Sequence, residues 1–284
     1  EDGEYDVNNG IYNNNLTFIG KSTQNTIINN AFFTSSSTLT FINLTLKSST
    51  VTNNGVLTAQ NVIFKDSYRT KGGAIYSESI YSQINIYNST FENNHAQYGG
   101  AIYVSQNNVL NVYDSTFKNN YAELFGGAIA AENKVNVTIK RSKFINDYST
   151  QNAGGALYIR DSTKSVGENL EFNNCSATFG GAIVSLKSNV TLINVNAYNN
   201  KAKYNGGALY SMYGYVTLKN SIFNSNSADN GGAVFADGVE IFHVYSNRFT
   251  NNVAQDTAGG LYILLSEIFY DSIFDKALNN SFSN

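Results

Sequence analysis

Short segments in which apolar and polar residues alternate run through this chain and recur at a nearly constant interval. Four examples place aliphatic side chains at every second position: Val135–Ile139, Ile84–Ile86, Val190–Leu192 and Val216–Leu218. Alternation with a period of two is typical of a β-strand with one buried face. A second short strand, Ala-Ile-Tyr or a close variant, follows most of the double glycines, and we expect its Ile or Leu to point inward. No segment of useful length shows the period of an amphipathic helix.

The double glycines themselves recur at steps of 25 to 28 residues. A fixed period of this size indicates one structural unit stacked on copies of itself. We expect each pair to form a sharp corner, because glycine tolerates positive φ and close backbone approach. The pairs are Gly72–Gly73, Gly99–Gly100, Gly126–Gly127, Gly154–Gly155, Gly180–Gly181, Gly206–Gly207, Gly231–Gly232 and Gly259–Gly260.

A phenylalanine marks the same repeat between the glycine pairs. The series is Phe18, Phe41, Phe64, Phe91, Phe117, Phe144, Phe172, Ala197, Phe223, Phe249 and Phe274. Three residues after the marker comes a mostly amide column: Ser67, Asn94, Asn120, Asp147, Cys175, Asn200, Asn226 and Asn252. Inward asparagines at a bend can bond to the asparagine one coil above and below, which predicts an asparagine ladder.

These patterns predict an all-β, single-stranded, right-handed parallel β-helix of about eleven coils, with three short strands per coil. We interpret residues 1–284 as a single β-helix domain. Within it we expect narrower N-terminal coils over 1–66, double-glycine coils over 67–260 and a C-terminal capping coil over 261–284.

Composition narrows the possible partners. The net charge is −3 and 14% of the residues are charged, so we predict no binding to nucleic acid. No apolar stretch approaches the length of a membrane-spanning helix, so we expect no direct membrane span in this chain. Cys175 is the only cysteine, which excludes a disulfide framework within the chain. The 44 asparagines fall in register with the repeat, beyond what composition alone would produce.

The repeated Gly-Gly-Ala-Ile/Leu and Phe-x-Asn-Asn tetrapeptides resemble the repeats of chlamydial polymorphic outer-membrane proteins. The stretches Asn15–Lys21, Asn25–Asn29 and Thr40–Leu46 are similar to large adhesin-like surface proteins of methanogenic archaea. The resemblance implies a right-handed β-helix of the pectin-lyase type on an extracellular surface, with a role in adhesion. It implies no particular ligand and no catalytic residues.

Polysaccharide cleavage on such a fold requires clustered carboxylates, for example a pair a few ångströms apart in a hydrolase. Here the carboxylates are scattered along the sequence, and the four arginines (Arg69, Arg141, Arg160 and Arg248) fall in different coils. His95 and His243 lack cysteines or carboxylates at metal-ligand spacing. We therefore predict no catalytic, cofactor-binding or metal-binding residues, and no enzyme.

Two sets of residues are candidates for surface contacts. Tyr76, Tyr103, Tyr158 and Tyr210 share one column, which we expect to face outward, either as a contact stripe for sugars or proteins or as stacking between coils. Among the Asn-x-Ser/Thr sequons, the glycosylation candidates are Asn136, Asn189, Asn88 and Asn15. Asn174 and Asn43 are expected to lie inside and to stay bare.

We therefore expect a cell-surface adhesin or stalk module, extracellular, that contacts other cells, glycans or neighbouring surface-protein subunits through a repetitive lateral face. One alternative is a structural subunit of a surface filament, sheath or layer, in which contacts between the end coils would dominate. A second is a carbohydrate-active protein similar to polysaccharide lyases or hydrolases.

Overall fold

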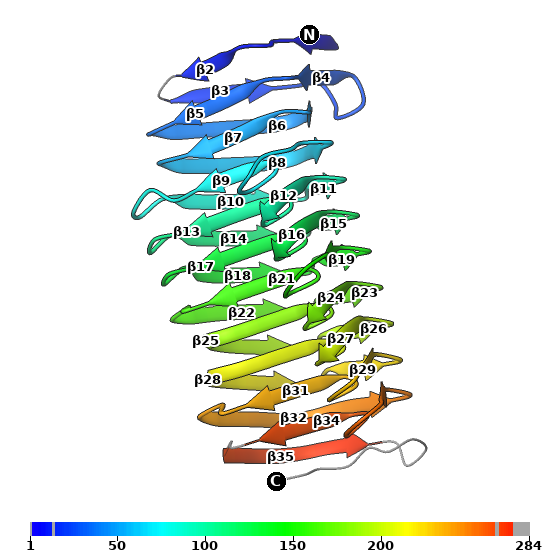
Figure 1. The fold of residues 1–284 in the computed structure, drawn as a ribbon. Helices are drawn as coiled ribbons and strands as arrows, with labels where there is room; N and C mark the ends of the chain where they lie inside the picture. Colours follow the sequence, from blue (N-terminus) through cyan, green and yellow to red (C-terminus); the bar gives the residue numbers. More distant parts are fainter. Residues whose placement is uncertain (1, 13–14, 265–266, 275–284) are drawn as a thin grey trace.

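The computed structural model describes residues 2–12, 15–264 and 267–274, and in this part of the chain it contains β-strands and no helix. The strands wind in about ten turns, close to the predicted eleven coils. Each turn lies on the next through parallel pairing, so the coils stack in chain order from the N-terminal to the C-terminal end (Figure 1).

Three faces form the wall of the solenoid. Face A contains β2 (Gly10–Tyr12), β5 (Phe32–Ser35), β7 (Thr50–Asn53), β9 (Ile75–Ser77), β13 (Ile102–Ser105), β17 (Ile129–Glu132), β21 (Leu157–Arg160), β31 (Val234–Asp237), β34 (Leu261–Leu264) and the first halves of β25 (Ile183–Ile193) and β28 (Leu209–Lys219).

Face B contains the second halves of β25 and β28, with β3 (Leu16–Ile19), β10 (Gln83–Tyr87), β14 (Val109–Tyr113), β18 (Asn136–Lys140), β22 (Lys164–Glu168) and the first halves of β6 (Thr38–Lys47), β8 (Val56–Lys65), β32 (Ile241–Thr250) and β35 (Glu267–Phe274), whose last residues continue onto face C. Face C contains the second halves of β6, β8 and β32, with β1 (Gly3–Asp6), β4 (Thr26–Asn29), β11 (Thr90–Glu92), β15 (Thr116–Lys118), β19 (Lys143–Ile145), β23 (Glu171–Asn173), β26 (Asn196–Tyr198) and β29 (Ile222–Asn224).

A fourth strand in the wider coils was not predicted. Seven short strands form a separate parallel sheet, which we call the side sheet, between face C and the double glycines (Figure 1). They are β12 (His95–Tyr98), β16 (Tyr121–Phe125), β20 (Tyr148–Ser149), β24 (Ser176–Phe179), β27 (Lys201–Asn205), β30 (Ser227–Ala228) and β33 (Val253–Ala254). The prediction of three strands per coil therefore holds for the solenoid wall but misses this sheet.

The core is a set of columns that repeat coil by coil. On face C the phenylalanine markers are buried and stacked face to face, with 4.7 Å between the ring centroids of Phe91 and Phe117 and 4.8 Å between those of Phe117 and Phe144. The markers Phe18 and Phe41 were wrongly placed in this column, because both lie on face B and Phe41 pairs with Ala59, only 18 positions further along. The early coils contain fewer residues than the later ones, so the equal steps from Phe18 to Phe41 and from Phe41 to Phe64 do not mark a single column.

The double glycines form the corner between the side sheet and face A, and the two glycines act differently. Gly126 has a φ of +64°, a conformation that L side chains rarely adopt. Gly127 lies so close to the next coil that a Cβ would come within 2.0 Å of the Gly155 carbonyl oxygen. The first glycine is therefore required by conformation and also by space, since a Cβ on Gly126 would lie 2.2 Å from the Ile129 carbonyl oxygen, and the second is required by space alone.

The predicted asparagine ladder lies inside the corner after face C. Asn94 Nδ2 donates to Asn120 Oδ1 at 2.9 Å and to the Phe64 carbonyl oxygen at 3.0 Å, and both asparagines are fully buried. Cys175 is also buried in this column. The expectation that Asn174 and Asn43 point inward is wrong: Asn174 is exposed and Asn43 half-buried, since both belong to bend positions with φ near +55°.

Candidate functional site

The predicted tyrosine stripe points away from the main core, but the side sheet covers it. Tyr103 and Tyr158 are each 2% exposed, and Tyr76 and Tyr210 are half-buried. They pack with aromatic side chains from the side sheet in a second apolar cluster; Phe125, for example, lies 4.5 Å from the Tyr158 ring. The prediction of an open contact stripe is therefore wrong for Tyr103 and Tyr158. The alternative, stacking between coils, fits their positions.

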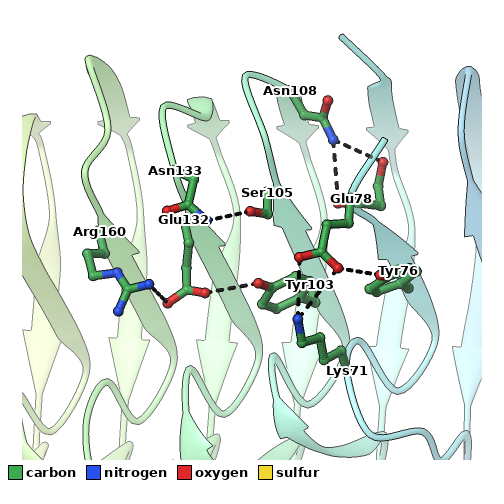
Figure 2. A network of polar contacts seen from close by, with 10 residues as sticks. Lys71, Tyr76, Glu78, Tyr103, Ser105, Asn108, Glu132, Asn133 and Arg160 are labelled. Carbon is green, nitrogen blue, oxygen red and sulfur yellow. Dashed lines mark hydrogen bonds and ion pairs between the residues drawn. The ribbon is translucent and has the colours of Figure 1, made fainter. Parts of the chain in front are cut away.

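A polar network extends from this tyrosine column along face A (Figure 2). Tyr103 Oη donates to Glu132 Oε2 at 2.9 Å, and Arg160 Nη2 lies 3.1 Å from Glu132 Oε1. The Glu132 side chain is 8% exposed, so its two carboxylate oxygens interact with Tyr103 and Arg160 in place of water. Burial, together with the Glu132 carboxylate, raises the pKa of the Tyr103 hydroxyl and keeps it a donor.

The second carboxylate of the network is bound in the same manner two coils earlier. Tyr76 Oη donates to Glu78, and Lys71 Nζ lies 3.4 Å from Glu78 Oε1 and 4.7 Å from the centre of the Tyr103 ring. The interpretation of the carboxylates as scattered was wrong here, since register places Glu78 and Glu132 in one column with Ser105 between them. Each carboxylate is already paired with one cation and one tyrosine, so the network ties four coils together (Figure 2).

The four glycosylation candidates are all exposed. Asn136 accepts a bond from Thr163 Oγ1 at 3.0 Å, and Asn15 accepts one from Ser37 Oγ at 2.8 Å; both bonds use the amide oxygen. Asn189 lines a shallow polar hollow at the corner between faces A and B. Exposure makes modification of these side chains sterically open, and whether it occurs stays a prediction.

Two outer ladders border the side sheet. The bend asparagines Asn93, Asn119, Asn146 and Asn174 are joined through exposed amides, each Nδ2 donating to the Oδ1 one coil back at 2.9 to 3.3 Å. Beside them, on the outer surface of the side sheet, the rings of Tyr68, His95, Tyr121 and Tyr148 follow one another, with 3.8 Å between the His95 and Tyr121 centroids. We call this second row the aromatic ladder.

His95 is the one histidine of the aromatic ladder. Its Nε2 lies 3.5 Å from Glu123 Oε1. Burial between two tyrosine rings lowers the pKa of His95, although Glu123 opposes the shift. The imidazole is therefore neutral at physiological pH and stacks as an ordinary aromatic ring.

The side sheet carries an open groove. A hollow of about 650 Å³ extends over five coils, from Tyr148 to Gln255. Its floor is formed by small residues such as Ala177 and Ala202, and Lys201 is exposed on its rim. A second hollow of about 570 Å³ adjoins it along the row of exposed bend asparagines and shares Tyr148 and Ser176 with it. We call the two together the lateral groove.

The lateral groove was not predicted from the sequence, although a signal for it exists. The groove follows the column four residues after the phenylalanine marker: Tyr68, His95, Tyr121, Tyr148, Ser176, Lys201, Ser227 and Val253. This column changes from aromatic to small or charged at Ser176, whereas structural columns of the repeat keep one residue type. Among the described residues, no three His, Cys, Asp or Glu side chains come together in a group that could hold a metal ion.

Comparison with known proteins identifies the class and then the family. Residues 100–282, more than half of the chain, match the family described as the right handed beta helix region, and the chain belongs to this family. This confirms the predicted fold class and its hand. Residues 88–105 also match the repeat of the Chlamydia polymorphic membrane protein, which confirms that resemblance. Similarity to archaeal adhesin-like proteins stays a prediction.

None of the curated proteins matches this chain. Among solved structures it is similar to a catalytic domain of a GH87 alpha-1,3-glucanase in complex with nigerose, with 12% identity and a TM-score of 0.49, over 98% of this chain and 63% of that chain. The prediction that the chain is not an enzyme is corrected by this neighbour, since a catalytic domain follows a similar course. At this identity the likeness transfers no activity or substrate. No helix in the described part of the chain is long and apolar enough to cross a membrane.

Proposed function

We propose that this chain is a cell-surface adhesion module that contacts glycans on other cells through the lateral groove. The observation that carries the proposal is the groove itself: it is open, it follows the solenoid axis, and it combines an aromatic ring, amides and lysines. Protein sites for sugars combine these groups, because a pyranose has an apolar CH face and polar hydroxyl edges. The coil height of about 4.8 Å is close to the length of one sugar unit in an extended chain.

Membership in a β-helix family and the match to a membrane-protein repeat support a place at the cell surface. A stacked fold is suited to this place, since coils bonded edge to edge form a stiff rod that extends its lateral face away from a membrane or wall. Glycans on the exposed sequons would lie on the corners around faces A and B, away from the side sheet.

Binding of the purified chain to intact cells and to a glycan array tests the proposal. We expect binding that is lost when the two groove lysines are reversed in charge (Lys201→Glu with Lys203→Glu). The matched control, Lys164→Glu with Lys219→Glu, makes the same charge change on face B and should leave binding intact. Equal binding by both double variants, or no binding to any surface, would overturn the proposal.

Two further readouts separate the alternatives. Sedimentation velocity over a concentration series detects filaments or layers; self-assembly without cell binding would favour the structural-subunit alternative. New reducing ends in the same glycan samples detect hydrolysis, which is measured because Glu78 and Glu132 share one column on face A. Turnover that is lost in Glu132→Gln and unaffected by the groove variant would assign the carbohydrate contact to face A instead.

A further inference from the structure

The aromatic ladder stops abruptly at Tyr148. The Tyr121 and Tyr148 rings stack with their centroids 5.1 Å apart and their planes 5° from parallel. In the next coil, the residue in register with Tyr148 is Ser176, so no ring from the described residues continues the stack. The Tyr148 side chain is 37% exposed and lines both hollows of the lateral groove.

Beyond Ser176 the same column continues with Lys201, which is in register with Ser176. The gap between the Tyr148 ring and the lysine is two coil heights, about 10 Å along the axis. Exposed Ser176 forms its floor, and the amide of Asn174 lies on its edge, at the end of the row of exposed bend asparagines. We call this gap the ring slot, since it has the width that one ring needs to stack on Tyr148.

We propose that the ring slot binds one acidic sugar unit of an extended polysaccharide, with its CH face on Tyr148 and its carboxylate at Lys201. This inference rests on the proposed function and names its ligand class. A pyranose fits the slot because its CH face meets the aromatic ring while its hydroxyls meet Asn174 and Ser176. Neighbouring sugar units of the polysaccharide continue over the small side chains of Ala177 and Ala202 in the groove.

Charge favours an acidic sugar over a neutral one. Lys201 is exposed, and within the described ranges no carboxylate forms an ion pair with it. The nearby Lys203 differs, since its ammonium lies 4.6 Å from the Tyr204 ring centre and the Asp229 carboxylate acts on it. Lys201 is therefore the cation of the slot that remains available to a ligand carboxylate.

The test is a calorimetric titration with two probes: a glucuronate-containing oligosaccharide and the same oligosaccharide after reduction of its carboxyls. We expect Lys201→Gln to weaken binding of the acidic probe by roughly tenfold or more, as for loss of a charged hydrogen bond, and to leave the neutral probe unchanged. Ser176→Tyr fills the slot with a protein ring and should abolish binding of both probes while the thermal unfolding midpoint is kept. Lys219→Gln on face B is the control and should bind as the unsubstituted chain does.

Equal affinity of the unsubstituted chain for the two probes, or unchanged binding by Ser176→Tyr, would overturn the inference. Its failure is distinguishable from failure of the proposed function. Cells bound through the groove lysines without affinity for the acidic probe would refute the acidic-sugar slot alone. If the unsubstituted chain bound neither cells nor the acidic probe, both the proposed function and the acidic-sugar slot would be refuted.

Discussion

Asp147 interrupts the buried asparagine ladder, and replacing it with asparagine tests how the ladder stabilises the solenoid. Its Oδ1 accepts two bonds from Asn120, from the backbone N at 2.8 Å and from Nδ2 at 2.9 Å. Its Oδ2 is buried and has no hydrogen-bond partner among the described residues. At the equivalent atom, the amides of the column donate to a marker carbonyl one coil back, as Asn200 Nδ2 does to the Phe172 oxygen at 3.1 Å. Asp147→Asn would supply this missing donor.

The gain in stability expected from Asp147→Asn follows from the pKa of Asp147, which burial raises from 3.8 to about 8. Because the folded-state pKa is the higher one, the favourable contribution of this group is fully present below pH 4 and is lost as the pH rises toward 8. Between pH 3.8 and pH 7 the buried carboxyl costs about 1.4 kcal/mol for each of about three pH units. The stability that Asp147 loses at pH 7 is therefore at most about 4 kcal/mol. Near pH 4 the gain shrinks to about 1 kcal/mol for the added hydrogen bond.

Denaturant unfolding at pH 4.5 and 7.5 measures this difference. We expect Asp147→Asn to be more stable than the unsubstituted chain at both values, and by more at pH 7.5. The exposed bend residue Asp66 gives the control: Asp66→Asn should change stability by less than about 0.5 kcal/mol. Asp147→Asn creates a glycosylation acceptor two residues before Ser149, so the proteins are made in a host without this modification. A gain that does not grow with pH, or a loss of stability at pH 7.5, would refute the reasoning.

Four further outcomes are expected. Tyr103→Phe removes the hydroxyl that donates to buried Glu132 and should cost about 1–3 kcal/mol in thermal or denaturant unfolding; no cost would mean that the network of Figure 2 is not stabilising. Gly127→Ala would place a Cβ 2.0 Å from the Gly155 oxygen and should give no folded protein in expression and circular dichroism trials, and a stable variant would contradict the corner geometry. Phe117→Ala should cost about 3–5 kcal/mol by denaturant unfolding, because it removes a ring stacked on both sides, whereas a cost below about 1 kcal/mol would argue against the column. In material from a glycosylating host, glycopeptide mass spectrometry should find glycans on the exposed sequon asparagines of face B, and bare peptides would sink that expectation.

The solenoid wall could be predicted from the sequence because its columns repeat one residue type at one spacing. The double glycines, the phenylalanine column from Phe64 onward and the ladder through Asn94 and Asn120 all depend on contacts between neighbouring coils. Such contacts favour the same side chain at the equivalent position of each coil, so they are visible in the sequence as a repeat of fixed period. The register of the first coils was predicted less well, because Phe41 has the same side chain as the marker but lies on another face.

The candidate site could not be predicted in the same manner. Strands such as β20 and β30 are two residues long and polar, so they lack the alternation that reveals a strand. Because the side sheet was not predicted, the tyrosine column of face A was expected to be exposed, whereas the rings of Tyr98 and Phe125 pack against it. The groove depends on Ser176 and Lys201 departing from an aromatic column, and a search for repeated residue types passes over such departures.

The central claim, that glycans bind along the side sheet, is tested most directly by hydrogen–deuterium exchange with and without a bound glycan from the array. We expect slower exchange in β20, β24 and β27, the strands that line the lateral groove, and unchanged exchange in β10 and β14 on face B. Protection confined to face A or face B, with no change in the side sheet, would contradict it.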